Sequence, residues 1–178
     1  NTFIIGGNGS GKTTFAKLLT GLYSHQQGKI TINGDTVEPD QLGEYFSVIF
    51  SDFYLFKKLY DVDTENKTDF IKQWLDLLRL KNRVKIENDS FSTVDLSGGQ
   101  RKRLAMLRCQ LENKSIFLFD EWAADQDPEF RRIFYRQLLP DMKKMGKIII
   151  AITHDDHYFD VADKIVKFDM GKIEYIKE

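Results

Sequence analysis

The alternation of apolar patterns along this chain predicts an α/β fold with a parallel central sheet. Short apolar runs typical of buried strands are separated by segments with helical spacing, and repeated strand–helix–strand units form parallel sheets. The 178 residues are 42% hydrophobic, which is enough for one domain with a core and too little for two full domains. Two short runs at 164–168 and 172–176, joined at Met170 and Gly171, add a partial antiparallel β part.

The first third of the chain contains three predicted strand regions and one helix. Residues 3–5 form an apolar run before a glycine-rich loop, and residues 12–22 follow with helical character. The segment 29–37 alternates apolar and polar residues around Asn33 and Gly34, a pair typical of hairpin turns. Residues 46–50 predict a further strand.

Residues 52–112 are predicted to form an inserted, mostly helical subdomain. Helical spacing over 68–80 and over 97–111 predicts two helices, and the stretch 81–95 between them is polar and irregular. The single domain would then have a core of 1–51 and 113–178.

The last third of the chain is predicted to form further strands and a helix of the core domain. Residues 116–119 and 148–152 predict buried strands, and the apolar spacing from Phe130 to Met142 predicts a helix between them. Pro140 should kink or end that helix, because proline lacks an N–H and its ring crowds the preceding turn.

Composition excludes some classes of partner. The formal net charge is −1, which gives no electrostatic reason to expect a nucleic acid. The one cysteine, Cys109, cannot form an internal disulfide, which suits a reducing compartment. No run approaches the ~20 apolar residues of a membrane-spanning helix.

A phosphate loop is the first chemical motif. Residues 6–13 match G-x-x-x-x-G-K-[ST], between a strand and a helix. Its backbone N–H groups and the helix N-terminus would form an anion cradle. Lys12 would reach the β- and γ-phosphates, Thr13 would ligate Mg²⁺, and Thr14 would donate to a phosphate oxygen. The expected nucleotide-binding residues are Asn8, Gly9, Ser10, Gly11, Lys12, Thr13 and Thr14. This motif alone does not separate kinases, GTPases and ATPases.

A second predicted anion site has no lysine. Leu96 is followed by Ser97, which should cap a helix, and by Gly98, Gly99 and Gln100.

An acidic pair follows the apolar strand 116–119. Asp120 is placed to hold Mg²⁺ through water, and Glu121 is the candidate general base for the attacking water.

These motifs together resemble the ABC ATPase family, whose five-residue signature is the string at 96–100. The resemblance covers the chain from Gly6 to Gly171. It implies that 97–100 contact the γ-phosphate of ATP held by a partner subunit, and that Asp127 is the aspartate of the family's D-loop. It also implies that His154 is the switch histidine, which contacts the γ-phosphate, although a lone histidine after a strand is more often structural.

The strings at 50–53, 96–104, 120–128, 134–140 and 154–159 are similar to a narrower group. That group comprises exporters of lasso peptides, cyclic lipopeptides and peptide siderophores.

The chain departs from the family's pattern in two places. Ser51 stands where most members have a glutamine that touches Mg²⁺ and the attacking water. We group Ser51 with Thr13 and Asp120 at the metal, although serine is shorter and would act through water or a loop shift. The aromatic residue that stacks on adenine usually precedes the phosphate loop, and nothing here precedes Asn1. We therefore expect an N-terminally truncated domain.

The resemblance implies an ATPase that powers the export of a substrate, a peptide, from the cytoplasmic face of the inner membrane. The expected partners are a second ATPase domain in a head-to-tail ATP-dependent dimer and an exporter's transmembrane domain, with no nucleic acid. The apolar loop at 53–56 is expected to contact that membrane domain, or else to anchor the helical subdomain.

Two rival functions stay open at this point. A soluble ABC ATPase of DNA repair is disfavoured by the roughly 84 residues between Lys12 and Leu96, which are too few for a long coiled coil. An ABC ATPase of translation usually carries two ATPase cassettes in one chain, and this chain shows one. A binding module without catalysis is disfavoured by the presence of Lys12, Asp120, Glu121 and His154.

Overall fold

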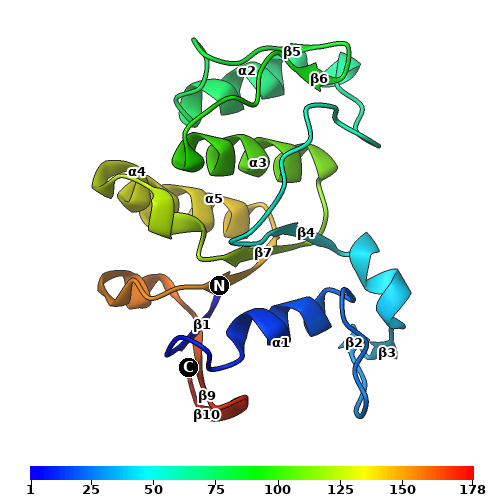
Figure 1. The fold of residues 1–178 in the computed structure, drawn as a ribbon, viewed down its shortest axis with the longest axis vertical. Coiled ribbons are helices and arrows are strands. Elements are labelled where there is room, and N and C mark those ends of the chain that lie inside the picture. Colours follow the sequence, from blue (N-terminus) through cyan, green and yellow to red (C-terminus); the bar gives the residue numbers. More distant parts are fainter. The chain divides into compact units, whose positions relative to one another are not determined.

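The structure is a computed structural model that describes all 178 residues. It divides the chain into two compact units, residues 1–51 with 114–178 and residues 52–113 (Figure 1). Each unit has its own secondary structure and is described by itself.

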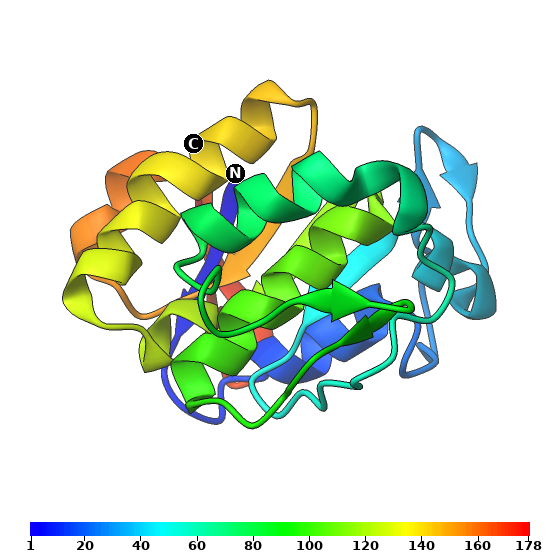
Figure 2. The same cartoon turned by 90° about the horizontal axis from the view of Figure 1, so that it is seen from above.

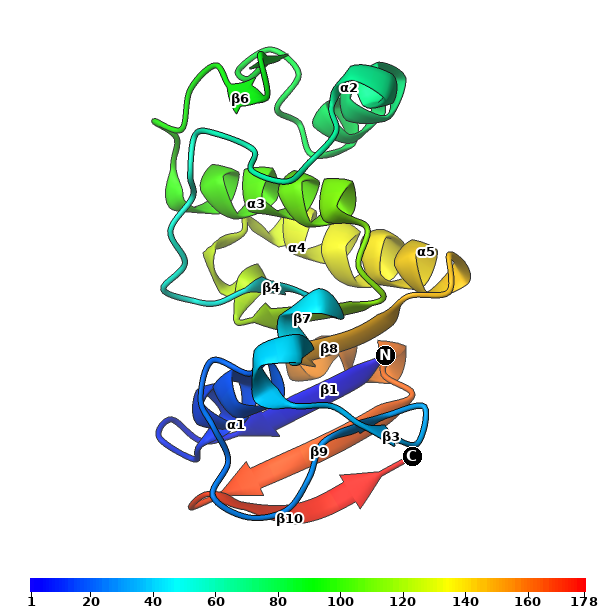
Figure 3. The same ribbon diagram turned by 90° about the vertical axis from the view of Figure 1, so that its right-hand side faces the viewer.

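The first unit is built on one sheet, which confirms the predicted fold class. Six strands lie in the order β10-β9-β1-β8-β7-β4 (Figure 3). All neighbours are parallel except β9 and β10, which pair antiparallel. The strands are β1 (Thr2–Gly6), β4 (Phe46–Ile49), β7 (Ile116–Asp120), β8 (Ile148–Ile152), β9 (Lys164–Asp169) and β10 (Lys172–Lys177).

Helices cover both faces of this sheet. Successive side chains of a strand point to opposite faces, and Phe3 and Ile4 of β1 are both buried. Ile4 belongs to the cluster that contains Ala16 of α1 (Lys12–Leu19). Phe3 contacts the ring of Tyr135 on the opposite face.

The helix predicted after β7 is present and continues past its proline. It runs as α4 (Pro128–Ile133), a π-helical segment (Phe134–Leu138) and α5 (Leu139–Lys144). Pro140 therefore does not end the helix. The N–H of Leu139 donates to the carbonyl of Phe134, five residues earlier, and this wider turn precedes the residue that has no N–H to donate.

Two smaller parts complete the first unit. The predicted hairpin is present as β2 (Thr31–Ile32) and β3 (Asp35–Thr36). Asn33 and Gly34 both have positive φ, 54° and 94°, as a two-residue hairpin turn of this type requires. A 3-10 helix, Pro39–Glu44, leads into β4.

The second unit is less helical than predicted. Its helices are α2 (Thr68–Leu77) and α3 (Gly98–Glu112), which pack together, and a short 3-10 turn precedes α2 (Figure 2). Residues 52–64 form no helix, and the polar stretch contains a hairpin of β5 (Ile86–Glu87) and β6 (Ser90–Phe91). Leu78, Leu80 and Phe91 have no exposed surface, so this unit has an apolar centre of its own.

None of the helices has both the length and the apolar character needed to cross a bilayer.

Candidate functional site

The glycines of the phosphate loop adopt backbone angles that other residues rarely tolerate. Gly6, Gly9 and Gly11 have φ of 144°, 77° and 98°. A Cβ on Gly6 would lie 2.2 Å from the carbonyl oxygen of Phe168. The loop runs directly from β1 into α1, so its amide groups and the helix N-terminus surround the same space.

Lys12 lies within this loop rather than in solvent. Its ammonium donates to the carbonyls of Gly6 at 2.8 Å and Gly7 at 2.9 Å, and the residue is 6% exposed. The positive charge is therefore held beside the amide-lined loop before any phosphate is bound.

Asp120 ends β7 in a buried position with two hydroxyl neighbours. Its Oδ2 accepts hydrogen bonds from Thr13 Oγ1 at 3.1 Å and from Ser51 Oγ at 3.4 Å. Burial raises the pKa of the Asp120 carboxyl, and the hydrogen bond from Thr13 opposes this increase. Its Oδ1 is buried without a hydrogen-bond partner. A carboxylate with a buried, unpartnered oxygen between two hydroxyls fits a magnesium site, because Mg²⁺ prefers oxygen ligands.

Glu121 and His154 lie together at the ends of neighbouring strands. His154 Nε2 is 3.2 Å from Glu121 Oε1, and both side chains are partly exposed. The backbone of Glu121 is left-handed, with φ of 51°, and its N–H donates to the carbonyl of Ile152 at 3.0 Å. This left-handed residue turns the chain out of β7. A hollow of about 440 Å³ is lined by Glu121 together with residues 8–14.

The predicted signature forms a capped helix start in the second unit. The N–H of Gln100 donates to Ser97 Oγ at 3.3 Å, and the N–H of Ser97 donates to Gln100 Oε1 at 3.2 Å. This reciprocal pair is a capping box. Ser97 and Gly98 are exposed.

Asp127 caps a different helix. Its carboxylate accepts a hydrogen bond from the N–H of Phe130 at 2.8 Å at the start of α4. The structure thus places the phosphate loop, Ser51, Asp120, Glu121, Asp127 and His154 in the first unit and residues 97–100 in the second.

A polar cluster beside His154, with Tyr135 and Thr153 buried in it, has no signal in the local sequence. Tyr135 Oη contacts Thr153 Oγ1 at 2.6 Å and donates to Asp155 Oδ2 at 2.9 Å. Arg131 Nη1 donates to Asp155 Oδ1 at 3.3 Å. Tyr135 and Asp155 lie in strings that resemble the exporter group, but no local pattern indicates that these residues meet.

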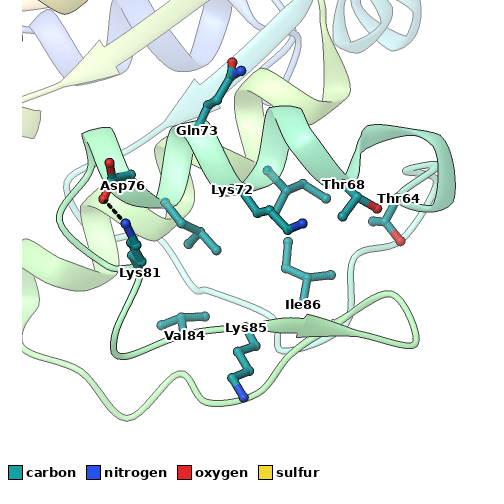
Figure 4. Close-up of a pocket in the computed structure, with 11 residues that line it drawn as sticks. Thr64, Thr68, Lys72, Gln73, Asp76, Lys81, Val84, Lys85 and Ile86 are labelled. Atoms are coloured by element: carbon teal, nitrogen blue, oxygen red, sulfur yellow. Dashed lines mark ion pairs between the residues drawn. The ribbon is translucent and has the colours of Figure 1, made fainter.

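A hollow larger than the one at the phosphate loop holds none of the motif residues. It occupies about 610 Å³ in the second unit, between α2 and the chain at 84–86 (Figure 4). Lys81 and Asp76 form an exposed ion pair of 3.2 Å at one end. Size alone therefore does not identify the site.

Asp120→Asn should raise the melting temperature of the protein without divalent metal. The change removes a buried charge that the hydrogen bonds from Thr13 and Ser51 stabilise only in part, because burial still raises the pKa of this carboxyl, and burying a charge costs free energy. Each kcal/mol gained should raise the melting temperature by about 2–4 °C in a chain of this size. Thermal unfolding in EDTA measures it, with the exposed Asp35→Asn as control. A lower melting temperature for Asp120→Asn would contradict the expected desolvation cost.

Comparison with known proteins agrees with this arrangement. The ABC transporter family model matches residues 1–124. The ATP-binding protein SyrD of Pseudomonas syringae pv. syringae is 49% identical over 177 residues, which are 96% of this chain and 31% of SyrD. The subtilin transport ATP-binding protein SpaT of Bacillus subtilis is 31% identical over 189 residues, 96% of this chain and 30% of SpaT.

A solved structure shares the fold. An ATP-bound bacterial Atm1-family ABC exporter superimposes with a TM-score of 0.80 at 22% identity, over 99% of this chain and 33% of the exporter chain. This chain spans about a third of the length of SyrD and SpaT. The family model covers well over half of the chain and includes both the phosphate loop and the acidic pair. The chain therefore belongs to the ABC transporter family, as an ATPase domain.

Proposed function

We propose that this chain binds and hydrolyses ATP to power the export of a substrate, a peptide, across a membrane. The observation that carries the proposal is the contact between Glu121 and His154 beside the hollow lined by the phosphate loop. That hollow combines an anion cradle with a carboxylate within reach of a water molecule.

The phosphate loop would hold the nucleotide. The amides of residues 8–11 and the hydroxyl of Thr14 donate to phosphate oxygens, and Lys12 exchanges its two carbonyl partners for the β- and γ-phosphates. Thr13 and Asp120, with Ser51 beside them, would hold Mg²⁺. When bound, Mg²⁺ neutralises negative charge on the phosphate oxygens.

Glu121 and His154 would carry the hydrolytic step. Glu121 orients a water molecule and accepts its proton as the water oxygen bonds to the γ-phosphorus, while the bond from that phosphorus to the β–γ bridging oxygen breaks and ADP leaves. His154 contacts the Glu121 carboxylate through Nε2 and, with ATP bound, would contact the γ-phosphate. The two neighbouring carboxylates would have different roles because their environments differ. Asp120 is 1% exposed and would hold Mg²⁺, whereas Glu121 lies at the surface of the hollow and would act on the water molecule.

The two units would have different roles. We assign residues 1–51 and 113–178 as the catalytic core and residues 52–112 as the subdomain that carries the signature. In a head-to-tail dimer, Ser97, Gly98, Gly99 and Gln100 would contact ATP held by the other chain, and Asp127 would lie at that shared interface. Ser97 and Gly98 at the start of α3 are exposed, as a contact with a phosphate held by another chain would require.

An aromatic surface in the second unit supports a membrane-domain partner. We define it as Tyr54, Phe56 and Tyr60, which are 75%, 49% and 53% exposed. The Tyr54 and Phe56 rings are 4.8 Å apart and those of Phe56 and Tyr60 are 6.1 Å apart. Leu55 and Leu59 lie between these residues in the chain and are buried, so apolar side chains anchor the segment while the three rings stay exposed. A cluster of exposed rings is typical of a contact surface.

Cell fractionation tests the export proposal. The intact protein should be recovered with membranes at the cytoplasmic face and should stay there after a high-salt wash. The similarity to a subtilin transport protein supports a peptide as the cargo. Recovery with ribosomes or DNA in the soluble fraction would contradict export and favour the soluble ATPase instead.

Ser51→Ala should change the hydrolysis rate by less than about fivefold. The Ser51 hydrogen bond to Asp120 is long, at 3.4 Å, and such a bond contributes under about 1 kcal/mol. The rate should be measured as a function of Mg²⁺ concentration. Thr13→Val is the matched comparison, since it removes a hydroxyl from the same carboxylate at 3.1 Å and should raise the Mg²⁺ requirement strongly. If Ser51→Ala raised the Mg²⁺ requirement as strongly as Thr13→Val, Ser51 would be a direct metal ligand.

A further inference from the structure

A closed ring of hydrogen bonds spans His154. It joins the side chains of Thr153 and Tyr135 to the side chain and backbone of Asp155. Tyr135 and Thr153 are 1% and 4% exposed. His154 itself takes no part in the ring, but both of its chain neighbours do.

The direction of each hydrogen bond in the ring is determined by the groups available. The phenol of Tyr135 has one proton, which it donates to the Asp155 carboxylate at 2.9 Å. Thr153 Oγ1 must then donate to Tyr135 Oη at 2.6 Å. The backbone N–H of Asp155 donates to Thr153 Oγ1 at 3.0 Å. Burial raises the pKa of Tyr135 well above its usual range, so the phenol keeps the proton that this order requires.

Arg131 extends the ring to the loop that follows Glu121. One guanidinium nitrogen donates to Asp155 Oδ1 at 3.3 Å. The other donates to the carbonyls of Ala124 at 3.5 Å and Gln126 at 3.4 Å. One side chain therefore contacts both the segment after Glu121 and the segment after His154.

The geometry of the helix after β7 brings the side chains of Arg131 and Tyr135 to the ends of β7 and β8. Arg131 lies on α4, and Tyr135 lies on the π-helical segment that precedes Pro140. Tyr135 packs in parallel against Tyr158, with ring centres 4.4 Å apart. A wider turn changes the direction in which the following side chains point, and such turns are frequent at functional sites.

We propose that Tyr135, Asp155 and Arg131 are positioning residues that keep His154 in contact with Glu121. The ring fixes the backbone on both sides of His154, and Arg131 holds the loop after Glu121 to the same carboxylate. The inference rests on the proposed role of Glu121 and His154 in hydrolysis. A displacement of the loop after Glu121 would reach His154 through Arg131.

Tyr135→Phe in the intact protein is the direct test. It removes one oxygen and leaves the ring stacked on Tyr158. A small misplacement of a catalytic group costs about one to two orders of magnitude, so kcat should fall about tenfold. KM for ATP should change less than about twofold, because none of the three residues lines the phosphate-loop hollow. Tyr158→Phe is the matched control, and it should keep the wild-type kcat and KM.

A double variant separates positioning from a merely structural role. In a His154→Ala background, Tyr135→Phe should cause no further fall in hydrolysis, measured as single-turnover release of labelled phosphate. Two residues that act through one contact give non-additive effects. An equal fall in both backgrounds would overturn the proposal, and so would a wild-type kcat for Tyr135→Phe.

Arg131→Lys covers the case in which Tyr135→Phe does not fold. Lysine keeps the charge but cannot bridge Asp155 and the two carbonyls together. It should lower kcat with KM unchanged, whereas Arg132→Lys at the neighbouring exposed position should not. Wild-type kcat for Arg131→Lys would overturn the proposal. Failure of the proposed function differs from both results, because the unmodified protein would then release no phosphate from ATP.

Discussion

Glu121→Gln should lower the rate of ATP hydrolysis by about 10³-fold, since a positioned general base contributes roughly 10²–10⁴. ATP binding should change less than about twofold, because glutamine has the same shape and the phosphate loop is untouched. The amide cannot accept the proton from water, yet its oxygen can still face His154, which is 3.2 Å from the carboxylate in the unmodified protein.

Phosphate release and ATP affinity should be measured on the same preparation. Glu174→Gln is a suitable control, because Glu174 is exposed and pairs with Lys167 in the β9–β10 ladder. Hydrolysis at the native rate would remove Glu121 from the role of base. Loss of ATP affinity along with the rate would mean that the carboxylate serves binding rather than the reaction.

The same variant should convert from monomer to dimer when ATP and Mg²⁺ are added. The phosphate loop belongs to one unit and the exposed signature helix start to the other. In the head-to-tail dimer that we propose, an ATP molecule bound by the loop of one chain would gain its second set of donors from the signature of the other chain. Sedimentation of Glu121→Gln should show a doubled mass with ATP, and a monomer without nucleotide.

Ser97→Asp in the Glu121→Gln background tests which surface makes the dimer. Aspartate caps a helix as well as serine does, so α3 should still begin correctly. Its negative charge would repel the γ-phosphate, and the protein should stay monomeric with ATP bound. Ser92→Asp adds the same charge at an exposed position outside the signature and should still dimerise. Dimerisation of Ser97→Asp would exclude the shared-site arrangement.

The sequence predicts best those parts of the site that are contiguous. The phosphate loop is one string because its task is local, to turn the backbone around an anion, and Gly6, Gly9 and Gly11 have the positive φ that this turn requires. The strand 116–119 predicts where Asp120 and Glu121 emerge, because an apolar run fixes the strand and the first carboxylate marks its end.

Other parts depend on contacts between distant segments. Tyr135 meets Thr153 and Asp155 across 18 and 20 residues, and no local period encodes such a meeting. The π-helical turn that precedes Pro140 was predicted only as a kink or an end, because propensity does not say how a helix accommodates a missing N–H. The second unit was expected to be mostly helical since the apolar spacing marked two helices, and its polar remainder gave no signal for the β5–β6 hairpin.

The strand register makes the site sensitive to chain length. Ile152 of β8 lies opposite Ile4 of β1 and opposite Asp120 of β7, so the phosphate loop, the acidic pair and His154 leave the sheet at one edge. Deleting one residue within β7 would move every later side chain of that strand to the other face of the sheet. An added residue between Asn33 and Gly34 would only lengthen a surface turn. Insertions and deletions should therefore be tolerated in the connecting loops and excluded from the three strands that end at the site.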